Sequence, residues 1–217
     1  MSATRGDTPE LSLHLRSLAG LDLVGAAPPL VRVEPVRERV VVVSASRPLA
    51  QEVFLDRCQQ DGVPVVVRPS GGGAVLLAPG VVVASVLARR QPHEAFPEAI
   101  FRRYVGAAGA ALAAGGAPPT AMRGISDLCI DDRKVAGSSL RLWRDRFLFQ
   151  MSLLHDPDLS LLERYLPLPT RMPAYRQGRP HALFVTSLVA SGCRVSEAAL
   201  LGELERHLRR ALDEQGR

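Results

Sequence analysis

Three consecutive glycines, Gly71 to Gly73, stand between two apolar runs of strand length and limit the folds that are open to this chain. The run VPVVVR (63–68) precedes them and the run AVLLA (74–78) follows them. Glycine loses more backbone entropy on ordering than any other residue, but its missing Cβ lets N–H groups converge and lets a ligand approach the main chain. The sequence therefore predicts two strands joined by a glycine loop that suits an anion.

Other apolar runs of strand length alternate with helical patterns along the chain. Strands are predicted at 39–44, 63–68, 74–78 and 80–88, with the last two joined as a hairpin at Pro79-Gly80, and at 127–131, 134–143 and 146–154 as a meander. Helices are predicted over 48–62, from Pro97 to Gly115-Gly116, and from Ser196 to the end of the chain. This order favours one α+β domain over residues 1–217, with mixed, largely antiparallel sheets packed with helices.

The charge and composition exclude several classes of protein. The net charge is +5, but the basic clusters at 88–90, 101–103 and 207–210 are short and have no aromatic residues interleaved, which argues against nucleic-acid binding. No apolar run approaches the length of a membrane span, and the first ten residues lack the layout of a signal peptide. We therefore expect no membrane association and a cytoplasmic location.

Lysine is nearly missing from this sequence, since Lys134 is the one lysine among 27 basic residues and the other 26 are arginine. Asparagine is absent altogether, which indicates a coding bias against both residues. Under such a bias arginine replaces lysine wherever only surface charge is needed. A lysine that remains is a candidate for a task that needs a compact ammonium as a point charge.

Two groups of residues near the glycine loop and the lysine support a ligand site. Arg68 ends the strand that leads into the loop and Ser70 adds a hydroxyl group, which together suit a carboxylate or phosphate. Gly137, Ser138 and Ser139 follow Lys134 on the same predicted strand, and their small size leaves room for a ligand across the sheet.

Two motifs in this order resemble the lipoate-protein ligase family, whose catalytic fold is shared with biotin protein ligases and octanoyltransferases. They are RPSGGGAV (68–75) and SDLCIDDRKVAGSSLR (126–141), and the resemblance covers roughly residues 38 to 155. The family has an Arg-x-Ser-Gly-Gly-Gly-Ala-Val loop, an Asn-Asp-Leu strand and a Lys-x-x-Gly-Ser segment. The resemblance implies a class II synthetase-like catalytic domain, in a compact version without the C-terminal accessory domain of large bacterial ligases.

The resemblance also implies roles for individual residues. Lys134 is the implied catalytic lysine, which contacts the carbonyl and phosphate oxygens of an acyl-adenylate, and Asp127 is the implied acidic residue near the nucleotide and Mg²⁺. Gln150 lies where the family has the central residue of a Gln-His-Gly segment. The implied substrate and nucleotide contacts are Arg68, Ser70, Gly71, Gly72, Gly73, Ala74, Val75, Asp127, Gly137, Ser138, Ser139 and Gln150.

The implied activity is that of a ligase that activates lipoate or octanoate with ATP and Mg²⁺. The acyl group would pass to a lysine of a lipoyl carrier domain, in a 2-oxoacid dehydrogenase or a glycine-cleavage-type protein. Two alternatives within this family stay open, which are ATP-independent octanoyl or lipoyl transfer between carrier proteins and a ligase subunit that needs a separate accessory protein. A third is a non-catalytic module that binds the acyl-adenylate or the carrier.

The transfer alternative needs a cysteine nucleophile. Cys129 is the best-placed candidate, because strand alternation puts it on the same face as Asp127, whereas we expect Cys58 and Cys193 to be structural. The segment RMPAYRQGRPH (171–181) allows two interpretations, a lid or carrier-docking segment over the pocket and a solvated connector.

Overall fold

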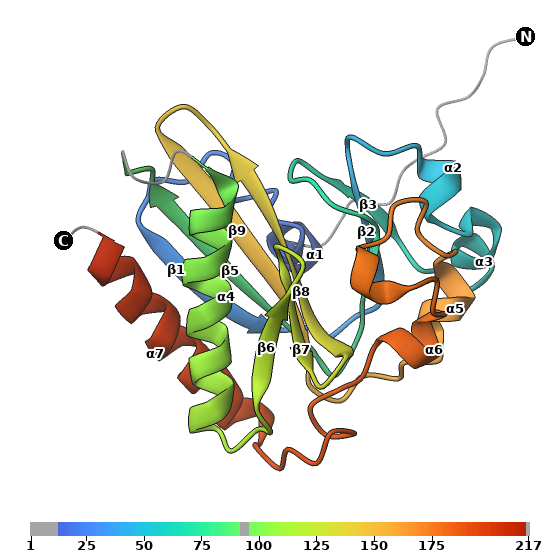
Figure 1. Cartoon of the computed structure of the whole chain (residues 1–217). Coiled ribbons are helices and arrows are strands. Elements are labelled where there is room, and N and C mark those ends of the chain that lie inside the picture. The colour runs from blue at the N-terminus through green and yellow to red at the C-terminus, as the bar shows by residue number, and fades with distance from the viewer. Residues whose placement is uncertain (1–12, 92–95, 216–217) are drawn as a thin grey trace, which may run out of the picture.

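The structure is a computed structural model that describes residues 13–91 and 96–215, and in this part of the chain the strands form two sheets (Figure 1). The larger sheet is antiparallel, in the order β1-β5-β9-β8-β7-β6, and the smaller has the order β3-β2-β4, with β2 parallel to β3 and antiparallel to β4. The strands are β1 Leu30–Pro35, β2 Val40–Ser44, β3 Val65–Arg68, β4 Val75–Leu77, β5 Val81–Arg89, β6 Thr120–Arg123, β7 Asp127–Ile130, β8 Arg133–Leu142 and β9 Arg146–Leu154. The predicted α+β class with mixed, largely antiparallel sheets is confirmed.

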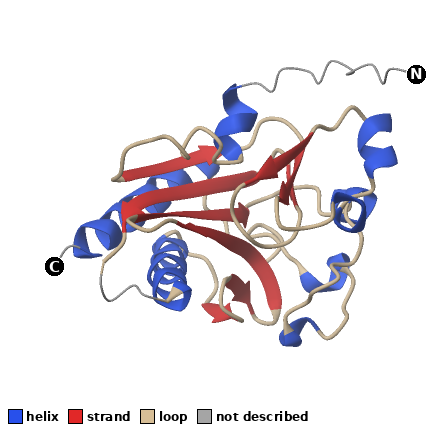
Figure 2. Cartoon of the chain, turned by 90° about the horizontal axis from the view of Figure 1, so that it is seen from above, coloured by secondary structure: helices blue, strands red, loops and turns tan. Residues whose placement is uncertain are grey.

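The helices cover the two sheets on opposite sides of the molecule. Two long helices, α4 (Pro97–Ala114) and α7 (Glu197–Gln215), lie side by side against one face of the larger sheet, and both were expected from the sequence (Figures 1 and 2). The short helices are α1 Leu13–Leu18, α2 Leu49–Glu52, α3 Leu55–Gln60, α5 Leu161–Tyr165, the 3₁₀ turn η2 Ala174–Arg176 and α6 His181–Phe184. None of the helices in the described ranges is long and apolar enough to cross a bilayer.

Strand β2 shows why several strands of this chain are apolar at every position rather than at alternate ones. All of its residues are buried. Val41 and Val43 pack in a core with α3 and α5, whereas Val40 and Val42 face a second core that contains Leu18 of α1. Because both faces of the strand are covered, the period-two pattern disappears from its sequence.

The largest core lies between the larger sheet and the helices α4 and α7. Tyr104 of α4 packs on two phenylalanines of β9, with ring centroids 5.8 Å from Phe147 and 5.4 Å from Phe149. Leu200, Leu204 and Leu208 of α7 belong to the same buried cluster. This core covers one face of the larger sheet, so a ligand site can form only on the opposite face.

The predicted hairpin at Pro79-Gly80 is wrong. Strand β4 pairs with β2 in the smaller sheet, while β5 pairs with β1 and β9 in the larger sheet. The turn therefore carries the chain from one sheet to the other. It is held there by the Gly80 carbonyl oxygen, which accepts the N–H groups of His155 and Asp156 at 3.0 and 2.9 Å.

The single helix predicted over 48–62 is also wrong, because the chain forms two short helices, α2 and α3, with a break at Val53 and Phe54. Val53 is extended, with φ −145° and ψ 139°, and its side chain is buried. The N–H of Phe54 donates to the carbonyl oxygen of Tyr165 at 2.9 Å. Packing against α5 thus outweighs the local helical pattern, and the break fixes Glu52 at the end of α2.

Gly80→Ala tests the connection between the sheets. Gly80 has φ +89°, and a Cβ there would lie 2.3 Å from the carbonyl oxygen of Asp156. Left-handed backbone costs a residue with a Cβ about 1–2 kcal/mol, and displacing the backbone adds strain. We expect the free energy of unfolding in urea to fall by more than about 2 kcal/mol.

Gly62→Ala is the matched control for this variant, because Gly62 has φ +65° but no atom within 4 Å of the added Cβ. We expect it to lose about 1 kcal/mol, from the backbone conformation alone. Equal losses at the two positions would contradict the role given to Gly80.

Candidate active site

A cavity of about 280 Å³ lies between the glycine loop, the face of the larger sheet opposite α4, and the segment before α6. Its apolar wall includes Leu18, Val42, Leu76, Leu77, Val83, Leu154, Leu162, Leu166 and Phe184. Its polar wall includes Arg68, Asp127, Lys134, Ser138, Ser139, Arg171 and Arg176. The cavity can therefore hold a molecule with a hydrophobic chain at one end and anionic groups at the other.

The glycine loop is built around the side chain of Arg68, which is 5% exposed. Its guanidinium donates to the carbonyl oxygens of Val42, Gly71 and Gly73 at 3.2, 2.9 and 2.8 Å. Burial lowers the pKa of Arg68 to about 10, partly offset by the charge of Glu52. We expected Arg68 to present its guanidinium to an anion, but the structure shows it holding the loop from inside.

Glu52 is a buried acidic residue that the sequence did not reveal. Its Oε2 accepts the N–H of Ala74 at 3.0 Å, and a Cβ on Gly73 would come within 3.3 Å of the same oxygen. The sequence predicted a continuous helix through Glu52, which gives no reason to place its side chain at the glycine loop. In the structure α2 ends at Glu52, and the side chain contacts the loop. Glu52 therefore fixes the end of the loop at Ala74, and Arg68 fixes the glycines before it.

The loop is also joined to strand β8 of the larger sheet. The hydroxyl groups of Ser70 and Ser139 lie 3.1 Å apart, and the N–H of Gly71 donates to the carbonyl oxygen of Leu140 at 3.4 Å. Ser70 and Gly71 do not themselves line the cavity, whereas the other predicted site residues do. These two residues therefore hold the loop over the sheet.

Lys134 and Asp127 form an ion pair on neighbouring strands, with Nζ 2.7 Å from Oδ1. The pairing of β7 with β8 has a bulge, since Cys129 pairs with Lys134 but Leu128 pairs with Ala136. Gly137 stands opposite Asp127, and a Cβ on Gly137 would lie 2.5 Å from the Lys134 Nζ. The lysine side chain thus reaches Asp127 by crossing the bare backbone of Gly137.

Tyr175 is a site residue that sequence reasoning did not single out. Its hydroxyl donates to Asp127 Oδ2 at 2.8 Å and accepts a weak bond from the Cys129 thiol at 3.6 Å. Burial, with the nearby charge of Asp127, raises the pKa of Tyr175 well above its usual value, so the hydroxyl stays protonated and keeps donating. Both oxygens of Asp127 are therefore held, one by Lys134 and one by Tyr175.

Tyr175 belongs to the segment 171–181, for which the sequence left two interpretations open. Four of its residues, Arg171, Pro173, Arg176 and His181, line the cavity, although much of the segment is also exposed to solvent. The His181 Nε2 lies 3.2 Å from the carbonyl oxygen of Pro167, and burial lowers the pKa of His181. The segment is a wall of the site.

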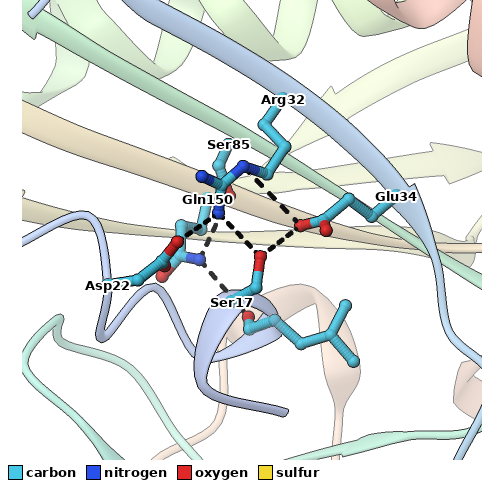
Figure 3. Close-up of polar contacts among 7 residues, drawn as sticks. Ser17, Asp22, Arg32, Glu34, Ser85 and Gln150 are labelled. Atoms are coloured by element: carbon cyan, nitrogen blue, oxygen red, sulfur yellow. Dashed lines mark hydrogen bonds and ion pairs between the residues drawn. The ribbon is translucent and has the colours of Figure 1, made fainter. Parts of the chain in front are cut away.

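Gln150 lies on β9 in the cavity wall, and Figure 3 shows how its amide holds helix α1. The Nε2 atom donates to the Ser85 hydroxyl at 3.2 Å and to the Leu18 carbonyl oxygen at 3.4 Å. On the same helix, Ser17 donates to Glu34 at 2.7 Å and accepts from Arg32 at 2.6 Å. The network keeps Leu18 at the end of the cavity.

Ser138 also contacts the protein itself, since its hydroxyl donates to the Ser126 carbonyl oxygen at 2.6 Å.

The three cysteines are buried and unpaired. Cys58 and Cys193 belong to hydrophobic cores, as expected for structural residues. Cys129 is completely buried, and burial raises the pKa of its thiol, with only part of the effect offset by the bond to Tyr175. In the described ranges no three His, Cys, Asp or Glu side chains are grouped to hold a metal ion.

The fold and the site together are those of a lipoyl ligase-type catalytic domain. The chain matches the lipoyl protein ligase A/B catalytic domain over residues 23–196, and it belongs to this family. A curated relative, "Probable lipoate-protein ligase A" of Mycoplasma pneumoniae, is 29% identical over 131 residues, which are 58% of this chain and 36% of the relative. The chain thus spans little more than a third of that relative.

Two solved structures show the same fold. A bipartite lipoate protein ligase of Thermoplasma acidophilum, solved with its E2 lipoyl domain as an archaeal lipoylation system, is 22% identical with a TM-score of 0.76, over 91% of this chain and 78% of that chain. A lipoate-protein ligase A bound with ATP is 21% identical with a TM-score of 0.74, over 91% and 80%.

Gly137→Ala tests the path of the Lys134 side chain. The added Cβ would lie 2.5 Å from Nζ, which is too close for both atoms, so we expect the amine to leave Asp127 for solvent. Because Lys134 is the one lysine, an amine-reactive reagent reports on it directly, and peptide mapping by mass spectrometry separates it from the N-terminal amine. Loss of a partly exposed ion pair predicts labelling about two- to fivefold faster.

Gly106→Ala on α4 is the control for this variant, since nothing lies within 4 Å of the added Cβ. We expect it to leave the labelling rate unchanged. Unchanged labelling of Lys134 in Gly137→Ala would show that the lysine does not depend on the bare backbone.

Proposed function

We propose that this protein activates lipoate or octanoate with ATP to an acyl-adenylate, and transfers the acyl group to a lysine of a lipoyl carrier domain. The observation that carries this proposal is the position of Lys134, whose ammonium is fixed by Asp127 at the polar wall of a cavity that also has an apolar end. Membership of the lipoyl protein ligase family supports it.

In the first step a carboxylate oxygen of the acid attacks the α-phosphorus of ATP, and pyrophosphate leaves. Negative charge builds on phosphate oxygens, and a preorganised cation in a site shielded from water stabilises that charge strongly. Lys134 is held for this task before the substrate arrives, since its amine is already directed by Asp127 across Gly137. In the second step the carrier amine attacks the acyl carbonyl and AMP leaves, with Lys134 beside the developing oxyanion.

The glycine loop and the apolar wall supply binding rather than chemistry. The loop exposes main chain without Cβ atoms at Gly72 and Gly73, so phosphate or carboxylate oxygens can approach its N–H groups. The aliphatic side chains between Leu18 and Leu166 suit the hydrocarbon chain of the acid. The polar end and the apolar end of the cavity are both formed by this one chain. This supports the prediction of a single catalytic-type domain over residues 1–217.

Asp127 is also the residue that would hold Mg²⁺. Among the described residues that line the cavity it is the one carboxylate, and Mg²⁺ is commonly bound by one or two carboxylates together with substrate phosphates. Its oxygens accept from Lys134 and Tyr175 but have further lone pairs, so the donor set fits the ion. When bound, Mg²⁺ would neutralise charge on the phosphates.

The accepting partner is proposed from the relatives. The Thermoplasma ligase was solved with an E2 lipoyl domain, which supports a lipoyl domain as the acceptor here. That ligase is bipartite, and this supports the alternative in which the present chain needs a separate accessory protein for adenylation. An assay with and without candidate accessory proteins separates the two forms of the proposal.

Cysteine-dependent acyl transfer is the weaker candidate. The thiolate is the reactive form of cysteine, and burial raises the pKa of Cys129, so the thiol is protonated near neutral pH. Its Sγ donates to the Tyr175 hydroxyl, and Cys129 does not line the cavity. These observations favour the ligase.

Replacing Lys134 tests the proposal. We expect Lys134→Ala and Lys134→Arg each to lower lipoate-dependent exchange of pyrophosphate into ATP by at least about a hundredfold, the usual effect of removing one preorganised donor. The arginine variant keeps the charge but not the compact ammonium. Arg144→Ala, which removes an exposed charge at the β8–β9 turn, is the matched control and should keep full activity. Lipoate-dependent exchange that survives in Lys134→Ala would refute the mechanism.

Cys129→Ala separates the ligase from the transferase. The two reactions are compared by intact-mass analysis of a lipoyl domain, incubated either with lipoate, ATP and Mg²⁺ or with octanoyl-carrier protein and no ATP. We expect the variant to modify the domain in the first mixture at a rate within about twofold of the parent, since the Cys129 thiol contributes packing and a weak hydrogen bond to Tyr175. Modification in the second mixture by the parent, lost in Cys129→Ala, would favour transfer.

A further inference from the structure

Arg176 is a buried cation in the wall of the cavity that the proposed function does not yet use. It ends the turn η2, one residue after Tyr175, and is only 3% exposed. Its guanidinium carbon lies 4.5 Å from the ring centroid of Phe184, which also lines the cavity. Burial lowers the pKa of Arg176, as expected for a charge taken out of water.

The hydrogen bonds of Arg176 are incomplete. Nε donates to the carbonyl oxygen of Arg179 at 2.9 Å, but Nη2 is buried and has no partner. No carboxylate in the described ranges forms an ion pair with this guanidinium. A buried charged donor without an acceptor is expensive, and native proteins rarely keep one unless a ligand or an ion completes it.

The charges around the cavity indicate which kind of ligand would accept the unpaired hydrogen bond of Arg176. Arg68 donates to three carbonyl oxygens and is close to the charge of Glu52, and Lys134 is paired with Asp127, the one carboxylate among the described residues of the wall. Arg171 and Arg176 are then left without a negative partner in the wall. A single carboxylate brings one negative charge, whereas the phosphate chain of a nucleotide brings several, so the phosphate chain balances this excess better.

The position of Arg176 is coupled to the ion pair at the centre of the site. Tyr175, its neighbour on the same turn, donates to the carboxylate that holds Lys134. Arg179 fixes the turn from the other side, by donating to the carbonyl oxygens of Tyr175, Arg176 and Asp132 at 3.0, 3.1 and 3.1 Å. The guanidinium is therefore preorganised, as a phosphate-binding group should be.

We infer that Arg176 is a binding residue for the phosphate chain of the nucleotide, and that its Nη2 donates to an anionic phosphate oxygen. This inference rests on the proposed function for the identity of the ligand. It assigns a second cation to the polyphosphate, supplied by the segment before α6 rather than by the glycine loop or by β8.

The test uses inorganic pyrophosphate as the probe and thermal unfolding as the readout, because a ligand that binds the folded state stabilises it by an amount that rises with the logarithm of the ligand concentration over Kd, so a concentration series of Tm gives the apparent Kd. We expect pyrophosphate to stabilise the parent protein, and Arg176→Gln to weaken the apparent affinity at least about tenfold, the usual effect of losing a hydrogen bond to a charged group. Arg176→Lys keeps the charge and should fall between the two.

Arg144→Gln is the matched control, since it removes an arginine charge in the same way but from the exposed β8–β9 turn, where the side chain does not line the cavity. We expect its pyrophosphate affinity to stay within about twofold of the parent. The Tm of each variant without ligand reports on folding, so a general loss of structure is separated from a loss of binding.

Two outcomes would overturn the inference. One is unchanged pyrophosphate affinity in Arg176→Gln, and the other is weaker lipoate binding in that variant with pyrophosphate affinity intact, which would assign the guanidinium to the acyl carboxylate. Failure of the proposed function is a different result, in which the parent protein binds pyrophosphate through Arg176 but shows no lipoate-dependent exchange of pyrophosphate into ATP.

Discussion

The ion pair between Lys134 and Asp127 is the interaction around which the site is arranged. A lysine side chain is long and loses much rotamer freedom when it is fixed, so a defined position needs a partner and a surface to lie on. Asp127 supplies the partner and the bare backbone of Gly137 supplies the surface. Tyr175, from a segment distant in the sequence, then fixes the second oxygen of the carboxylate. Residues from three places in the chain therefore set the direction of one amine, two through polar groups and Gly137 through its missing side chain.

The two sheets contribute different parts of the ligand site. The larger sheet, backed by α4 and α7, is the rigid part and carries Lys134, Asp127 and Gln150. The smaller sheet supplies the glycine loop, whose shape depends on Arg68 and Glu52 inside it. Because the connection at Gly80 passes from one sheet to the other, the loop and the lysine face each other across the cavity although they belong to different sheets.

The sequence predicted the elements whose signals are local. The apolar runs became strands, the helices beginning at Pro97 and near Ser196 are present, and the glycine loop and Lys134 meet at one cavity. What it missed depends on contacts between distant segments. A turn at Pro79-Gly80 can have the same residues whether its two strands pair with each other or belong to different sheets. The helical pattern around Val53 likewise does not indicate that the Phe54 N–H donates to the carbonyl oxygen of Tyr165. Tyr175, Glu52 and Arg176 carry no motif, and their roles come from what packs against them.

The near absence of lysine has a chemical consequence for an enzyme of the proposed kind. An acyl-adenylate reacts with primary amines, and one that escapes from its site can acylate the protein that made it. Guanidinium groups stay charged at physiological pH and are poor nucleophiles, so the 26 arginines offer such an intermediate no acceptor. The one ε-amine of the chain is engaged with Asp127 inside the cavity. In an enzyme of the proposed kind, few amines on its own surface would then compete for the acyl group, so a lysine delivered by a partner would be the favoured acceptor.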